Sequence, residues 1–238
     1  MLGKFINHCE DSLTAAVFTH LLHLPSEVFW RILRQACYSP DLPQAAGEPL
    51  KLEWWPKWDP KGTGNNTYIE PDVFIRFREF DLIIEAKRWD DKQQSKRQWQ
   101  DQLIAYRNEY GEECCPVRMI AIGGLYQDHD ELLNVKAKKT RASAETPALM
   151  CTVHMCRWRE LLAQCKRVRR ELKRLEQPDS LALASSRILD DVIGLFGCHG
   201  YSTGRWFADF HFDRHQLSPT TLSHHRLFRG RTLALTQT

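Results

Sequence analysis

Residues 67–89 read TYIEPDVFIRFREFDLIIEAKRW, and the predicted sheet is built around this segment. Its two parts, residues 67–77 and 80–89, are rich in β-branched and aromatic side chains, which favours two β-strands. The link between them is very short and centres on residues 78–79. We therefore expect the two strands to pair as an antiparallel hairpin.

Three charged residues of this hairpin are predicted to share one face. Glu85 and Lys87 are two apart, so a strand points both side chains the same way. A loop of two or four residues places Asp72 directly opposite Glu85, with Cβ atoms about 4.5–5.5 Å apart. Two carboxylates that close repel each other unless they share a cation, and Mg²⁺ prefers such oxygen ligands. The sequence therefore predicts a magnesium site beside the Lys87 ammonium, and the alternative is an ordinary ion pair.

The flanking sequence predicts helices on both sides of the hairpin and further strands after it. Apolar residues recur at helical spacing before and after the hairpin, and short β-branched runs follow. We expect helices over 10–24, 27–36, 96–110, 158–175 and 180–196, a short helix near 130–135, strands over 117–123 and 149–155, and one short strand within 38–66. This order is typical of an α/β fold, with a small mixed β-sheet flanked by helices.

The bulk composition fits one large domain or one domain with a modest extension. The chain has 238 residues, of which 42% are hydrophobic and 26% are charged. No apolar run approaches the roughly 20 residues that span a bilayer, and the N-terminus lacks the apolar core of a signal peptide. We therefore expect a cytoplasmic protein without a membrane contact.

Basic residues are concentrated in three runs although the net charge is only +3. The runs lie at residues 87–97, 136–141 and 165–174. A single run of this kind is usually a solvated face. Three runs beside an acidic motif favour contact with phosphates.

The cysteines offer one alternative metal site. Eight cysteines at irregular spacing do not indicate a secreted disulfide framework. Cys151, His154 and Cys156 resemble a zinc ligand set, but they lie on a predicted buried strand. Structural thiols are the favoured interpretation.

Two motifs together resemble a known nuclease superfamily. Pro71-Asp72, twelve intervening residues and Glu85-Ala86-Lys87 resemble the PD-(D/E)xK pattern of restriction endonucleases, Holliday-junction resolvases and repair nucleases. The segment from Gln102 to Tyr106 resembles the QxxxY motif of the RecB-like branch, and Gln102 falls on the predicted buried side of its helix. The resemblance implies a restriction endonuclease-like core over residues 1–165, followed by a helical C-terminal extension over residues 166–238.

The resemblance also implies roles for individual residues. Asp72, Glu85 and the carbonyl of Ala86 would bind Mg²⁺, for which Mn²⁺ can substitute, and Lys87 and Gln102 would complete the catalytic centre. Glu10 shares a stripe with Leu13, Val17 and Leu21 and resembles the acidic residue that many members place near the metal, with Asp11 as the alternative. The residues expected to contact nucleic acid are Arg76, Arg88, Tyr106, Lys136, Lys138 and Lys139.

These features predict a metal-dependent nuclease that hydrolyses DNA. No helix-turn-helix or zinc finger that reads bases is evident, so target choice is expected to come from DNA structure, from other protein subunits or from a homo-oligomer. The resemblance is typical of an effector subunit of a bacterial anti-phage or DNA-repair system. Three alternatives stay open: a catalytically silent nuclease fold that serves as a scaffold, an RNA-cleaving nuclease, and an unrelated α/β protein whose ion pair mimics the motif.

Overall fold

The protein forms a six-stranded mixed sheet flanked by helices, as the α/β prediction expects. The computed structural model describes residues 10–39, 41–88, 93–113, 115–135 and 148–201, all within one compact unit. The strands are β1 (Lys51–Trp54), β2 (Val73–Arg76), β3 (Asp81–Ala86), β4 (Val117–Ile122), β5 (Glu131–Val135) and β6 (Leu149–Cys156). The helices are α1 (Glu10–Leu21), α2 (Ser26–Ala36), α3 (Lys96–Tyr110), α4 (Trp158–Lys173) and α5 (Ser180–Cys198), with a 3₁₀ turn at Gly111–Glu113.

The sheet order is β1-β2-β3-β4-β6-β5. Its two ends are antiparallel, because β1 pairs with β2, β2 with β3 and β5 with β6 in that sense. The centre is parallel, because β4 lies between β3 and β6 and runs in their direction. Parallel strands are normally covered on both faces, and this sheet follows that rule.

The register of the predicted hairpin is confirmed. Val73 pairs with Ile84 and Arg76 pairs with Asp81, so four residues, 77–80, link the two strands. Extending this register by one residue brings Asp72 opposite Glu85. The predicted strand over 67–77 is shorter than expected, because β2 begins only after Pro71, which has no N–H to donate to a ladder.

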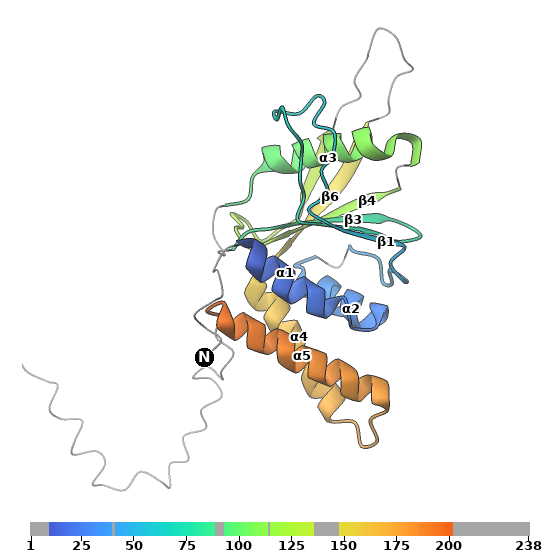
Figure 1. Ribbon diagram of the computed structural model, residues 1–238, viewed down its shortest axis with the longest axis vertical. Coiled ribbons are helices and arrows are strands. Elements are labelled where there is room, and N and C mark those ends of the chain that lie inside the picture. The colour runs from blue at the N-terminus through green and yellow to red at the C-terminus, as the bar shows by residue number, and fades with distance from the viewer. Residues whose placement is uncertain (1–9, 40, 89–92, 114, 136–147, 202–238) are drawn as a thin grey trace, which may run out of the picture. The chain divides into compact units, whose positions relative to one another are not determined.

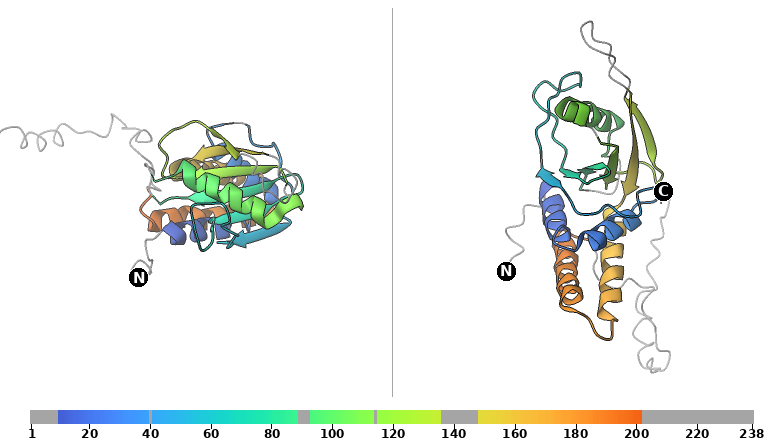
Figure 2. Two further views of the ribbon diagram at one scale, coloured as in Figure 1. Left: turned by 90° about the horizontal axis from the view of Figure 1, so that it is seen from above. Right: turned by 90° about the vertical axis from the view of Figure 1, so that its right-hand side faces the viewer.

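Helices cover the two faces of the sheet unequally. Figure 1 shows α3 alone on one face and α1, α2, α4 and α5 on the other, and Figure 2 shows the same layers from two further directions. Alternation along the strands divides the core accordingly. Ile84 and Ala86 pack with α1, α2, α4 and α5, whereas Phe74 and Ile83 pack with Trp99 of α3. The side chains of even-numbered β2 residues and odd-numbered β3 residues therefore face α3.

The segment near residues 130–135 corrects one prediction. We expected a short helix there, but Glu131–Val135 forms the edge strand β5 and pairs with all of Leu149–Val153 in β6. Leu133 and Val135 are buried while Leu132 and Asn134 are exposed, which is the alternation of a half-buried strand. The pairing partner lies beyond the local sequence window, so helical spacing alone favoured the wrong element.

The C-terminal helices share the core of the N-terminal ones. Residue 166, where the helical extension is predicted to begin, lies within α4. Leu161, Cys165 and Val168 of α4 and Leu189 of α5 belong to the same buried cluster as α1 and α2. Within the described residues, no helix combines the length and the apolar character that crossing a bilayer requires.

Candidate functional site

Glu85 is the centre of the candidate site. It lies near the end of β3 and its residue is only 2% exposed. Its Oε1 accepts hydrogen bonds from the Lys87 ammonium and from Gln98 Nε2, the latter at 2.6 Å, and its Oε2 accepts one from Gln102 Nε2 at 2.5 Å. A buried carboxylate needs such partners, and charge-assisted hydrogen bonds favour its ionised form. Gln98 and Gln102 of α3, together with Lys87 directly after β3, therefore fix the orientation of the Glu85 carboxylate.

Asp72 stands on the same face of the sheet, as the sequence predicts. It is 7% exposed, and its Oδ2 accepts a hydrogen bond of 2.7 Å from the backbone N–H of Ala86. This bond ties the start of β2 to the end of β3 beside Glu85. The two acids are therefore neighbours on adjacent strands, beneath α3.

Lys87 is held at the site through both its side chain and its backbone. The ammonium bonds Glu85 and lies 3.2 Å from the carbonyl oxygen of Ala86, and the side chain is 15% exposed. The backbone N–H donates to the carbonyl of Ile122 at 2.7 Å, and the Lys87 carbonyl accepts from Trp158 Nε1 at 2.7 Å. The ion pair that the alternative interpretation expects is present, and it lies beside a second carboxylate.

A row of three glutamines supports the acids, and sequence reasoning identified only one of them. Gln94, Gln98 and Gln102 recur every four residues, so they share one side of α3 and the turn before it. The Gln94 amide donates to the carbonyls of Glu85 at 3.1 Å and Gly123 at 3.2 Å and accepts from Trp99 Nε1 at 2.9 Å. The four-residue spacing was the signal that could have indicated Gln94 and Gln98.

Two glycines at the end of β4 allow the close approach of the Lys87 backbone. Gly123 and Gly124 have φ values of +66° and +61°, which L side chains rarely adopt. A Cβ atom on Gly123 would lie 2.2 Å from the Lys87 carbonyl oxygen, and one on Gly124 would lie 2.7 Å from Lys87 Cβ. Any side chain here would displace Lys87.

The oxygen donors at this site suit a hard divalent cation. Asp72 and Glu85 supply carboxylates and Ala86 supplies a carbonyl, and Mg²⁺ is typically held by one or two carboxylates plus water. No group of three or more His, Cys, Asp or Glu side chains among the described residues could hold a metal ion. A divalent ion held by these oxygens would need water to complete its coordination.

The predicted third acid cannot be placed. Glu10 begins α1, but the side chains of Glu10 and Asp11 lie outside the described part of the structure. Leu13, Val17 and Leu21 of the same helix are fully buried against the face of the sheet opposite α3. An acid from α1 would therefore have to reach the site around the ends of the strands.

Tyr106 corrects another prediction. We expected it to contact nucleic acid, but it has no exposed surface. Its hydroxyl donates to Asp81 Oδ2 at 2.7 Å and accepts from the Cys115 N–H at 3.1 Å. Asp81 is four residues, or about 13 Å along a strand, from Glu85. Gln102 thus bonds the Glu85 carboxylate at one end of β3, whereas Tyr106 bonds Asp81 at the other end and stabilises the fold.

The basic residues that were expected to contact phosphates have different outcomes. Arg76 forms a two-pronged ion pair with Asp81 at 2.7–3.2 Å and stacks over Tyr110, so its guanidinium supports the fold. Arg88 is half-buried, and its carbonyl accepts from Tyr201. Lys136, Lys138 and Lys139 lie outside the described residues. Contact of these side chains with DNA stays a prediction.

The zinc alternative has no support in the strand that carries it. Cys151 and Cys156 belong to the buried clusters on opposite faces of the sheet. Burial raises the pKa of Cys151 to about 12, which keeps this thiol neutral in the folded chain. His154 Nδ1 instead bonds Asp130 at 2.7 Å.

Comparisons with known proteins do not assign the chain to a family. No family model matches it. An uncharacterized protein of Pasteurella multocida is 33% identical over 132 residues, which make up 55% of this chain. The chain spans about half the length of that relative, since the match covers 48% of it. A chain in a solved half-complex of Thermococcus gammatolerans McrB AAA+ hexamers with bound McrC aligns with 70% of this chain, and the alignment covers 32% of that chain. The two are 11% identical and superpose with a TM-score of 0.25, which is too low to indicate a shared fold.

Proposed function

We propose that this chain is a divalent-metal-dependent nuclease of the PD-(D/E)xK type that hydrolyses DNA phosphodiester bonds. One observation carries the proposal. Asp72 and Glu85 stand side by side on one face of the sheet, with Lys87 bonded to Glu85 and the glutamine of the QxxxY motif bonded to the same acid. Lys87 of the first motif and Gln102 of the second thus bond the Glu85 carboxylate, and Asp72 lies opposite Glu85 on the next strand.

The residues of the site have separable roles in this proposal. Asp72, Glu85 and the Ala86 carbonyl would hold Mg²⁺ or Mn²⁺, which when bound supplies Lewis-acid activation of the phosphate and of a water molecule. Lys87 orients the attacking water and stabilises the charge that develops on the phosphate. Gln98 and Gln102 keep the Glu85 carboxylate in one orientation. Hydrolysis joins the water oxygen to phosphorus, and the leaving sugar oxygen takes up a proton.

Selection of the target is assigned in this proposal to other components. The site residues contact a phosphate and a metal ion, and such contacts carry no sequence information. Partner subunits, or further copies of this chain, would choose the DNA. A role as the effector subunit of a bacterial anti-phage or repair system is consistent with that arrangement.

A cleavage assay tests the proposal. The chain is incubated with supercoiled, nicked and linear DNA, and with labelled RNA, in Mg²⁺ or Mn²⁺. We expect Glu85→Ala and Lys87→Ala to lower the rate of DNA cutting by about 100-fold or more while DNA binding is retained. Glu79→Ala is the matched control, because Glu79 is an exposed acid in the β2–β3 link.

The outcomes separate the alternatives. Wild-type cutting that the two substitutions abolish supports the nuclease. A wild-type chain that binds DNA without cutting it in either metal is the silent scaffold. Cutting of RNA alone would make the chain a ribonuclease. Glu85→Ala cutting at the wild-type rate would overturn the proposed site.

A further inference from the structure

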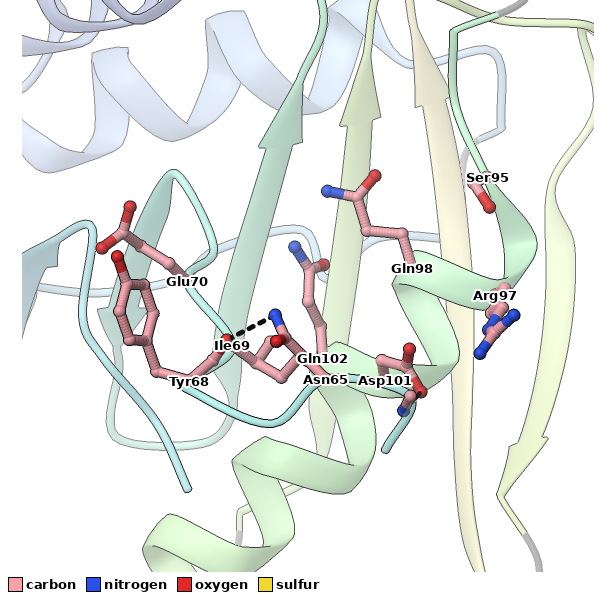
Figure 3. A pocket seen from close by; sticks show the side chains of 10 residues that line it. Asn65, Tyr68, Ile69, Glu70, Ser95, Arg97, Gln98, Asp101 and Gln102 are labelled. Carbon is pink, nitrogen blue, oxygen red and sulfur yellow. Dashed lines mark hydrogen bonds between the residues drawn. The ribbon is translucent and has the colours of Figure 1, made fainter. Parts of the chain in front are cut away.

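A trough of mixed polar and apolar lining runs along α3 and opens beside the candidate site. It consists of two adjoining cavities of about 530 and 670 Å³ that share Gly64, Arg97 and Asp101. Its walls are α3 and the loop of residues 62–70 that precedes β2, as Figure 3 shows for the first cavity. Gln98 and Gln102, which bond Glu85, also line that cavity, so the trough begins where the site ends.

The Gln102 amide points to the kind of ligand that the trough takes. A carboxylate can only accept hydrogen bonds, so the amide NH₂ faces Glu85 and Oε1 faces away from it. Gln102 is 1% exposed, and Oε1 makes no hydrogen bond with any described residue. A buried acceptor of this kind normally has a partner. Base amino groups, sugar hydroxyls and water can donate to it, whereas phosphate oxygens cannot.

Tyr68 supplies an aromatic surface at the same cavity. Its side chain lines the first cavity and its residue is 38% exposed. The Lys57 ammonium lies over one face of the ring, 4.7 Å from its centroid, and leaves the other face for a base. Exposed aromatic rings next to cationic groups are the usual stacking platforms for unpaired bases.

Arg97 supplies the charge. It is exposed, lines both cavities and forms no ion pair with another described residue. The 62–70 loop holds the guanidinium closely, because a Cβ atom on Gly64 would lie 2.3 Å from Arg97 Nη2. The loop is itself tied to α3, since the Gly64 N–H donates to Asp101 Oδ1 at 3.4 Å, and just before the loop Asn108 Nδ2 donates to the carbonyl of Lys61 at 2.8 Å.

We infer that this trough binds an unpaired nucleotide next to the site of cleavage, with its base stacked on Tyr68 and a flanking phosphate on Arg97. Asp101 at the wall offers a carboxylate that can accept from the amino group of a base. Bases in a duplex are stacked and paired and cannot enter such a cavity. This inference rests on the proposed nuclease function and narrows its substrate to strands with unpaired nucleotides, such as single strands, flaps and overhangs.

Binding without divalent metal tests the inference separately from cleavage. Fluorescence anisotropy in EDTA is measured with a labelled 12-nucleotide DNA strand, with the blunt duplex of the same sequence, and with the RNA strand. We expect the wild type to bind the single strand more tightly than the duplex. Tyr68→Ala is expected to weaken that binding by about tenfold or more, and Tyr68→Phe to retain it. Tyr38→Ala is the control, because Tyr38 is equally exposed at 38% and does not line either cavity.

Arg97→Ala and Gly64→Ala examine the charged end of the trough. Both are expected to weaken single-strand binding several-fold, the second because its methyl group displaces the guanidinium. Arg170→Ala is the control, since Arg170 is an exposed arginine of α4 without an ion pair among the described residues. Equal or tighter binding of the blunt duplex, or wild-type affinity in both Tyr68→Ala and Arg97→Ala, overturns the inference. Tighter binding of RNA than of DNA supports it and identifies the strand as RNA. Metal-dependent cutting with wild-type binding in these variants would leave the nuclease proposal standing and remove only the trough.

Discussion

The hydroxyl of Tyr106 is a structural group at the far end of β3 from Glu85. It bonds the fully buried carboxylate of Asp81 and the backbone of Cys115. Tyr106→Phe is expected to lower the free energy of unfolding by about 2 kcal/mol, the usual contribution of a hydrogen bond to a charged group. Urea denaturation measures this, with Tyr126→Phe, at a residue 45% exposed, as the control. A loss of DNA affinity at unchanged stability would contradict this role.

Gly123 is a position where any side chain would meet the backbone of Lys87. Gly123→Ala combines a left-handed φ of +66° with a Cβ atom 2.2 Å from a carbonyl oxygen. Gly111 has a similar φ of +53°, but a Cβ atom there would have no neighbour within 4 Å. We expect Gly123→Ala to be destabilised by about 1–3 kcal/mol more than Gly111→Ala. If Gly123→Ala and Gly111→Ala unfold at the same urea concentration, the contact between the new Cβ atom and the Lys87 carbonyl does not lower the free energy of unfolding.

At the residue scale, the sequence predicts the side chains that depend on local geometry. The shared face of Asp72, Glu85 and Lys87 follows from the two-residue period of a strand and from the length of the link between β2 and β3. The observed register agrees with that link length. Gln98 has only the four-residue spacing of the glutamines as a signal, because α3 carries several polar residues. Which of them faces Glu85 depends on how the helix lies over the sheet, and that is set by contacts far along the chain.

The strand β6 carries a buried histidine, His154, whose titration should affect stability. Burial lowers the pKa of His154, and the positive charge of Arg118 lowers it further. The negative charges of Asp130 and Asp41 raise the pKa but do not outweigh burial. The folded state therefore favours the neutral ring, and the unfolded state binds the proton more readily. The contribution of neutral His154 to the free energy of unfolding is fully present above the unfolded pKa of about 6.5. It is lost as the pH falls below that value.

Denaturation at two pH values tests this prediction. We expect the urea midpoint of the wild type to fall between about pH 7.5 and about pH 5.5. His154→Gln, which cannot titrate, should show a smaller fall over the same interval. A fall of equal size in the variant would mean that other groups carry the pH dependence.

At the element scale, helices and core strands were predictable, and the edge strand was not. Residues 96–110 have an apolar side at helical spacing and end at Gly111, so their helix was assigned within its observed bounds. Residues 131–135 have only two buried side chains, and their conformation is decided by pairing with β6. Such pairing is a contact between distant segments, which a local pattern cannot contain.

For the whole molecule, composition and element order give the α/β class but not the strand order. The sequence does not indicate that β6 lies between β4 and β5, or that α4 and α5 complete the layer begun by α1 and α2. Among the described residues, α3 is the one helix over the face that carries Asp72 and Glu85, and the trough lies along it.

The central claim is that Asp72 and Glu85 jointly bind one divalent ion, and calorimetric titration with Mn²⁺ tests it most directly. Asp72→Asn and Glu85→Gln each remove one carboxylate with little change in shape, and Glu79→Gln removes an exposed acid as the control. We expect the wild type and Glu79→Gln to bind one Mn²⁺ ion. In Asp72→Asn and in Glu85→Gln, the affinity for Mn²⁺ should be lost or weakened by about 100-fold or more. A wild-type chain that binds no Mn²⁺, or variants at Asp72 and Glu85 that bind it like the wild type, would contradict the account.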